Sequence, residues 1–144
     1  MSQTSPNDPE RPSPETAGQP VALSVMLAVP DAQAAARWYQ DALGATTMWD
    51  LGSVVGLRIG AAPLIIGEPA ANGWSTPGDA STTTVRVELF APDPDSVLAR
   101  AVGAGAVSHH DVSDHRMPWG IHRQGGFVDP FGHVWFVGDH SPLR

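Results

Sequence analysis

The composition of this 144-residue chain is that of a globular domain, with 42% hydrophobic and 16% charged residues. Its formal net charge is −7 and it has no cluster of Lys or Arg, which argues against nucleic acid as a partner because such a surface repels phosphate backbones. The chain has no cysteine, which excludes disulfides, thiolate catalysis and Cys-ligated zinc.

The first 20 residues are polar and contain five prolines. They lack the apolar segment of a secretory signal, and no later run is long enough to cross a bilayer, so we expect a cytoplasmic protein without a membrane partner. Residues 1–20 are predicted to form a disordered, solvated tail, because they bury too little surface to offset the entropy of ordering. A short structural arm is the alternative.

Residues 21–68 are predicted to form a first βαβββ module. The apolar, β-branched run from Val21 to Val29 is typical of a buried strand. Asp31 follows as a helix N-cap, an apolar stripe repeats with helical spacing, and Gly44 ends the helix as the residue that best tolerates a positive φ. Three short strands with glycine-marked turns complete this module, over 46–50, 54–60 and 63–67.

A second βαβββ module is predicted over residues 82–144. A strand covers 82–90, Asp93 is the N-cap of the next helix, and Pro94 suits its first position because the missing N–H needs no partner there. Gly105 is expected to end the helix.

The two modules are related by an internal repeat. Asp93 follows Asp31 by 62 residues, Gly105 follows Gly44 by 61, and the last strands are offset by 71. Residues 69–81, rich in Pro, Gly and Ser, form the linker. The sequence therefore predicts an α+β fold, one compact domain of two βαβββ modules. Together they form a curved sheet or half-barrel with outer helices and a concave cleft.

Three segments of the chain match a known family: VPDAQAAARWYQDALGA (29–45), LFAPDPDSVLARAVGAGA (89–106) and FVDPFGHVWFV (127–137). Together they resemble the vicinal oxygen chelate superfamily, which includes glyoxalases, extradiol dioxygenases, fosfomycin-resistance enzymes and bleomycin-binding proteins. The resemblance covers residues 21–140 and is greatest to the PhnB-like, glyoxalase-type branch.

The DPFG motif in the last segment also has a physical interpretation. The carboxylate of Asp129 accepts from the backbone downstream of it, Pro130 presets φ, and Gly132 closes a turn. We interpret the motif as a structural turn between two strands. His133 is then a residue at the start of the next strand rather than a metal ligand.

Metal-dependent members of the superfamily use four ligands, two in each module: a His or similar residue early in the first strand, and a Glu in the last. The resemblance and the repeat place these positions at Ser24, Ile65, Arg86 and Phe136. None of them suits a divalent cation, and the fixed charge of Arg86 would repel one. We therefore expect no metal and no cofactor.

A local cluster of histidines leaves one alternative open. His109, His110 and His115, with Asp111 and Asp114 beside them, would supply metal ligands, although their spacing matches no helical pattern. Solvated histidines in loops and at strand ends are the simpler interpretation. A general-base role for His110 or His122 also stays open, because imidazole titrates near neutral pH.

Alternation along the strand over 82–90 places Arg86, Glu88 and Phe90 on one face and aliphatic residues on the other. The aliphatic face should contact the helices, so the mixed face should line the cleft. There Arg86 and Glu88 would orient a polar group of a ligand. An internal salt bridge between them is the alternative.

The tryptophans supply flat surfaces for stacking on planar ligands. Trp135 is expected in the core, whereas Trp49, Trp74 and Trp119 are better placed at the mouth of the cleft, with ordinary surface packing as the alternative. The complete set of candidate ligand-binding residues is Trp49, Arg86, Glu88, Phe90, Met117, Trp119 and Phe136.

These features favour a metal-free protein that sequesters a small planar or aromatic compound, as drug-binding members of the superfamily do, with a role in antibiotic or natural-product resistance. One alternative is a lyase, isomerase or dioxygenase that uses a metal or acid–base residues. The other is a protein-interaction module, and fold alone does not decide. We also expect a homodimer with two equivalent clefts, in which the modules pair within a chain or swap between chains.

Overall fold

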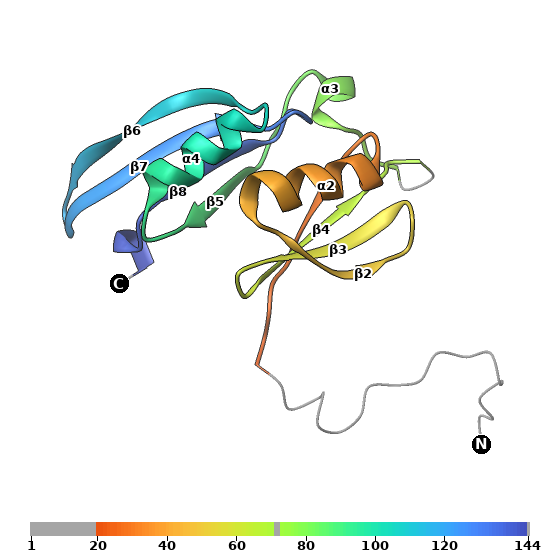
Figure 1. Ribbon diagram of the computed structural model, residues 1–144, viewed down its shortest axis with the longest axis horizontal. Coiled ribbons are helices and arrows are strands. Elements are labelled where there is room, and N and C mark those ends of the chain that lie inside the picture. Colours follow the sequence, from red (N-terminus) through yellow and green to blue (C-terminus); the bar gives the residue numbers. More distant parts are fainter. Residues whose placement is uncertain (1–19, 71–72, 144) are drawn as a thin grey trace.

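The computed structural model describes residues 20–70 and 73–143. The predicted tail over 1–20 lies outside these ranges apart from its last residue. The described chain forms two four-stranded mixed sheets, each covered by one long helix (Figure 1). The predicted α+β fold of two βαβββ modules is confirmed.

The first module contains β1 (Val25–Ala28), α2 (Ala32–Leu43), β2 (Thr46–Asp50), β3 (Val54–Ile59) and β4 (Ala62–Gly67). Its strand order is β1-β4-β3-β2, with β1 parallel to β4 and the other pairs antiparallel. The first strand is shorter than predicted, because residues 21–24 lie outside the sheet with their side chains exposed.

The second module repeats this order as β5-β8-β7-β6. Its elements are β5 (Arg86–Phe90), α4 (Pro94–Gly103), β6 (Val107–Met117), β7 (Gly120–Val128) and β8 (Val134–Gly138), followed by the short 3-10 helix η1 (Ser141–Leu143). The strand predicted over 82–90 begins only at Arg86. The linker contains a short helix that the sequence analysis did not predict, α3 (Pro77–Ala80).

Both long helices begin at the predicted caps. The carboxylate of Asp31 accepts from the N–H of Ala34, and that of Asp93 accepts from the N–H of Ser96. Gly44 ends α2 with a φ of +67°, as predicted. The end of α4 differs slightly: Ala104 is its C-cap, and Gly105 adopts the positive φ just beyond it.

The strand register confirms the repeat residue by residue. Val25 pairs with Leu64 in the first module, and Val87 pairs with Trp135 in the second. These pairs are related by the same offsets of 62 and 71 residues that the sequence predicted. The extra residues of the second module form the long hairpin of β6 and β7.

The two modules share one hydrophobic core. Buried residues from both sheets and both helices belong to it, including Tyr39 on α2 and the stacked rings of Phe127 and Trp135, whose planes differ by 7°. Polar contacts also join the modules: Trp38 Nε1 donates to the carbonyl of Ala104, and His133 Nε2 lies 2.7 Å from the carbonyl oxygen of Ala28.

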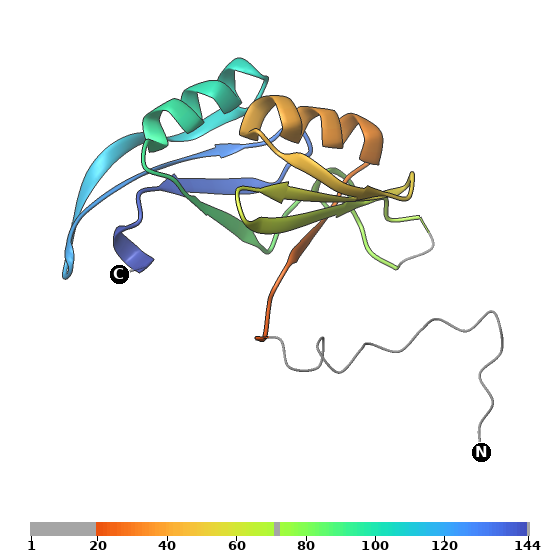
Figure 2. The ribbon, with the colours of Figure 1, turned by 60° about the horizontal axis from the view of Figure 1, so that its bottom comes forward.

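Figure 2 shows α2 and α4 side by side on one side of the molecule, with both sheets beneath them. The face of each sheet that points away from its helix is therefore left without a helical cover. No helix in the described ranges is long and apolar enough to cross a membrane.

The DPFG turn is structural, as interpreted from the sequence. Oδ1 of Asp129 accepts from the N–H groups of Phe131 and His133, and Oδ2 accepts from Trp135 Nε1 and the hydroxyl of Tyr39. Gly132 has a φ of +91° and its N–H donates to the carbonyl of Asp129. His133 is buried just before β8.

Candidate functional site

The candidate site is the face of the second sheet that lies opposite α4. Val87 and Leu89 pack against the core, so Arg86 and Glu88 project from the other face of β5. On the neighbouring strand, Phe136 pairs in register with Glu88 and shares this face. The structure therefore supports the predicted alternation for Arg86 and Glu88 against Val87 and Leu89.

Arg86 and Phe136 are in contact across the two strands. The guanidinium carbon of Arg86 lies 5.1 Å from the centre of the Phe136 ring, which is the geometry of a cation–π interaction. No ion pair joins Arg86 to Glu88 within the described ranges. The internal salt bridge that the sequence left open is therefore not what orients Arg86.

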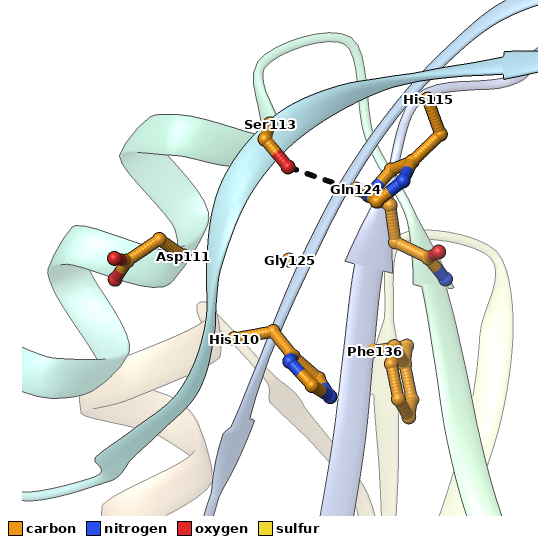
Figure 3. Close-up of a pocket in the computed structure, with 7 residues that line it drawn as sticks. All are labelled: His110, Asp111, Ser113, His115, Gln124, Gly125 and Phe136. Carbon is orange, nitrogen blue, oxygen red and sulfur yellow. Dashed lines mark hydrogen bonds between the residues drawn. The ribbon is translucent and has the colours of Figure 1, made fainter.

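A hollow of about 410 Å³ lies beside this ring. Figure 3 shows the side chains of His110 and Phe136 projecting into the same space, with Gln124 and His115 close by and Asp111 pointing away from them. The residues around the hollow come from β6, β7 and β8: His110, Asp111, Ser113, His115, Gln124, Gly125 and Phe136.

The aromatic rings beside the hollow pack against one another. The centres of the His110 and Phe136 rings are 5.8 Å apart, and their planes differ by 33°. His109 contacts both rings edge-on, at 4.4 Å from His110 and 6.4 Å from Phe136. Ser113 Oγ and His115 Nε2 are 3.4 Å apart and add a polar edge.

One further imidazole lies on this face of β7. His122 is 5% exposed, and its Nδ1 is 2.8 Å from a carboxylate oxygen of Asp139. Hydrogen bonds from Ser141 and then from His122 lower the pKa of the Asp139 carboxyl, which is therefore ionised at neutral pH. The carboxylate fixes the orientation of the imidazole.

The superfamily's metal-ligand positions do not fit a divalent cation. Ile65 pairs in register with Met26, Ser24 precedes the first strand, and Arg86 lies over the ring of Phe136. A hydroxyl, two apolar side chains and a fixed cation give no imidazole or carboxylate ligand. Among the described residues, no group of three or more His, Cys, Asp or Glu is placed to hold a metal ion.

Met117 and Trp119 lie away from the hollow. They occupy the tip of the β6–β7 hairpin, where Met117 pairs with Gly120 and the side chain of Trp119 is 51% exposed. Figures 1 and 2 show this tip at the end of the molecule opposite β2.

Trp49 belongs to β2 of the first sheet. Its indole packs directly over Gly56, where a Cβ atom would lie only 2.3 Å from Cε2 of the ring. Trp49 and Trp119 therefore do not border one cleft within a single chain. Phe90, at the end of β5, lines a separate hollow of about 210 Å³ near the end of α2.

A smaller hollow of about 310 Å³ lies between β1 of the first module and the segment that leads into β5, with His133 of the second module also lining it. Trp74 lines it and packs over Gly67. The indole Nε1 of Trp74 is the one buried side-chain nitrogen or oxygen in the described ranges without a hydrogen-bond partner.

Sequence reasoning missed Ser113 and Gln124 as site residues and did not place His122 beside the hollow. Along β7, Arg123 and the buried Phe127 lie on the face towards α4, and His122 and Gln124 lie on the opposite face. Period-two alternation along this strand would therefore have identified His122 and Gln124. The signal along β6 is weaker, because the register shifts twice between Ser108 and Ser113.

The chain matches known proteins along most of its length. The sequence model of the family described as Glyoxalase-like domain matches residues 24–137. An uncharacterised protein of Mycobacterium bovis is 34% identical over 136 residues, covering 85% of this chain and 84% of that protein. An uncharacterised protein of Mycobacterium tuberculosis strain H37Rv is also 34% identical, covering 85% of this chain and 75% of that protein.

Solved structures share the fold at lower identity. TioX from Micromonospora sp. ML1 is 22% identical with a TM-score of 0.68, over 84% of this chain and 99% of that one. A lactoylglutathione lyase from Agrobacterium tumefaciens is 19% identical with a TM-score of 0.61, over 87% and 97%. A glyoxalase-related enzyme from Fulvimarina pelagi is 18% identical with a TM-score of 0.60, over 82% and 87%.

Proposed function

Because this chain belongs to the glyoxalase-like domain family of the vicinal oxygen chelate superfamily, we propose that it binds a small planar or aromatic molecule. The binding site is the face of the second sheet around Phe136. Binding would sequester the compound, as drug-binding proteins of the glyoxalase/bleomycin-resistance type do, and would give resistance to a drug or natural product.

The observation that carries this proposal is the contact between Arg86 and Phe136, at two of the four positions where metal-dependent relatives have ligands. A flat ligand placed against the Phe136 ring buries apolar area, worth roughly 25 cal/mol per Å² before association costs. The hollow of about 410 Å³ has room for such a ligand.

Arg86 and Glu88 would bind a polar edge of the ligand through their charged groups. Both side chains are exposed on the same face of β5, and neither forms an ion pair within the described ranges, so their charges are available to a ligand. A hydrogen bond to a charged group contributes about 1.5–3 kcal/mol. The preferred compound is therefore flat and mostly apolar, with one polar edge.

Tryptophan fluorescence during a screen of planar natural products tests the proposal. We expect at least one compound to quench the emission, and we expect Phe136→Ala and Arg86→Leu each to weaken its binding by about tenfold, as for other anchor residues. Arg58→Leu is the matched control, because Arg58 is an exposed arginine on a strand of the first sheet. If both variants bind every compound as well as the parent does, the site is not on the second sheet.

We also propose that the protein is a homodimer. β2, which contains Trp49, and the tip of the β6–β7 hairpin, which contains Trp119, lie at opposite ends of the molecule, and these tryptophans are 39% and 51% exposed. A twofold-symmetric pair has two equivalent sites and offers a way to cover such apolar side chains.

A further inference from the structure

His122 is held in one orientation by Asp139 and lies beside two residues that line the hollow, without lining it itself. Its register partner is His115, which lines the hollow, and it is two residues from Gln124, another lining residue. The imidazole packs over Gly138, where a Cβ atom would lie 2.7 Å from Cε1 of the ring. Gly138 follows Phe136 by two residues on β8, so His122 lies about one pleat, or roughly 7 Å, from the stacking surface.

The pairing with Asp139 determines which nitrogen of His122 is available. An ionised carboxylate only accepts hydrogen bonds, so Nδ1 carries the proton that it donates to Asp139 over 2.8 Å. In the neutral imidazole the other nitrogen, Nε2, is then an acceptor. It has no hydrogen-bond partner among the described residues and is not among the fully buried unpaired atoms, in a residue that is 5% exposed.

We propose that His122, positioned by Asp139, accepts a proton from an acidic hydroxyl of the bound planar molecule, a phenol or an enol. This inference rests on the proposed function, because it requires a ligand against Phe136. The O–H bond of the ligand breaks and an N–H bond forms at Nε2, so the site then holds a phenolate or enolate and an imidazolium.

Charges on this face would stabilise the ion pair that forms. The imidazolium keeps its hydrogen bond to the Asp139 carboxylate, and the guanidinium of Arg86 lies over Phe136, where the ring of the anion would rest. His115 is the other titratable group placed beside His122, as its partner in β6. His115 adds no negative charge, whereas the carboxylate of Glu88, the register partner of Phe136 on the same face, opposes the anion.

Two probes that differ by one methyl group test this inference on the full-length protein. Para-nitrophenol has an acidic hydroxyl and its anion absorbs at longer wavelength, whereas para-nitroanisole has the same ring but no proton to give. At the pKa of free para-nitrophenol, where an unperturbed imidazole with a pKa of about 6.5 is mostly neutral, about half of the probe is protonated in solution. We expect the wild-type protein to bind both probes and to shift bound para-nitrophenol to the phenolate spectrum.

Variants separate proton acceptance from binding. We expect His122→Gln to lose the phenolate band and to keep its affinity for para-nitroanisole, which also shows that the folded hollow is intact. Asp139→Asn should weaken the band, and the control His140→Gln, outside the hollow, should keep it. A band of equal strength in His122→Gln, or no band in the wild type, would overturn the inference and leave the proposed function standing. Failure of both probes to bind would contradict both.

Discussion

Asp129 shows how one buried carboxylate organises the region between the modules. It is 4% exposed and accepts from two side chains, Tyr39 and Trp135, and from two backbone N–H groups. Every hydrogen bond to it is therefore charge-assisted and shielded from water. The motif has a structural role, although it is also the most specific part of the family resemblance.

Replacement of Asp129 by Asn should destabilise the protein by about 1.5–3 kcal/mol, because the amide has one acceptor oxygen and leaves a buried donor unpaired. Urea unfolding measures this loss. The matched control is Asp93→Asn at the N-cap of α4, where Asn and Asp are equally good caps. Equal stability of the two variants would contradict the role assigned to Asp129.

The single tyrosine of the chain makes its ionisation directly observable. Burial, and then the charge of Asp129, raises the pKa of Tyr39 well above its ordinary value of about 10. The stability that results is fully present below about pH 10 and is lost as the pH rises above it, because only the unfolded chain then releases the proton. Absorbance of tyrosinate should stay absent in the folded protein above pH 10 and appear with unfolding. Titration at the ordinary pKa in the folded state would contradict this.

The residues at the metal-ligand positions predict that no transition metal is held there. Ser24, Ile65, Arg86 and Phe136 supply no imidazole or carboxylate, so protein purified without added metal should retain no stoichiometric transition metal on this face. Elemental analysis after dialysis measures the metal content per chain. Zinc, nickel, manganese or iron at one equivalent per chain would contradict the prediction.

At the scale of elements, the caps and glycines are the features that the sequence predicts best, because they act locally. Asp31, Asp93 and Gly44 each specify a boundary through their own backbone or side chain. The starts of β1 and β5 were predicted four residues too early. Apolar runs such as Val21–Leu23 carry strand propensity, but the sheet partner that decides pairing is distant in sequence.

The sequence predicts only part of the candidate site, again because strand pairing depends on residues that are distant in the chain. Alternation within β5 correctly placed Arg86 and Glu88 on the face away from the core. The contribution of β6 depends on two register shifts and on the length of a hairpin, which local patterns do not specify. Trp119 was expected near Trp49 because nothing in the sequence showed that the hairpin extends away from the first sheet.

Two glycines at helix ends give a matched pair of variants. Gly44 has a φ of +67°, so Gly44→Ala should cost about 1–2 kcal/mol through left-handed strain. Gly103 is the last residue of α4, with open space around its Cα, so Gly103→Ala should stabilise by about 0.5–1 kcal/mol. Urea unfolding measures both, and a loss of stability in Gly103→Ala equal to that in Gly44→Ala would contradict the assignment.

In the complete molecule, the outer faces of the two modules differ in their side chains. Their helix-covered faces merge into one core, whereas their outer faces carry distinct side chains. The second sheet presents Arg86, Phe136 and several imidazoles, among them those of His110 and His115. The first sheet presents Trp49 over Gly56 and Met26 beside Gly67. The repeat therefore preserved the backbone and core while the exposed faces diverged.

Sedimentation at micromolar concentration tests the proposed homodimer. We expect a mass of about twice the 15.1 kDa of the chain, because symmetric pairs are the commonest assemblies of single-domain proteins with exposed apolar surface. A mass near 15.1 kDa would contradict the proposed homodimer.

Amide NMR during titration with a planar compound tests most directly whether the second sheet is the binding surface. We expect the shifted resonances to group around Gly125, Gly126 and Phe136 on β7 and β8, and the shifts to shrink in Arg86→Leu. Shifts that group instead around Gly56 and Gly67 of the first sheet, unchanged in Arg86→Leu, would contradict it.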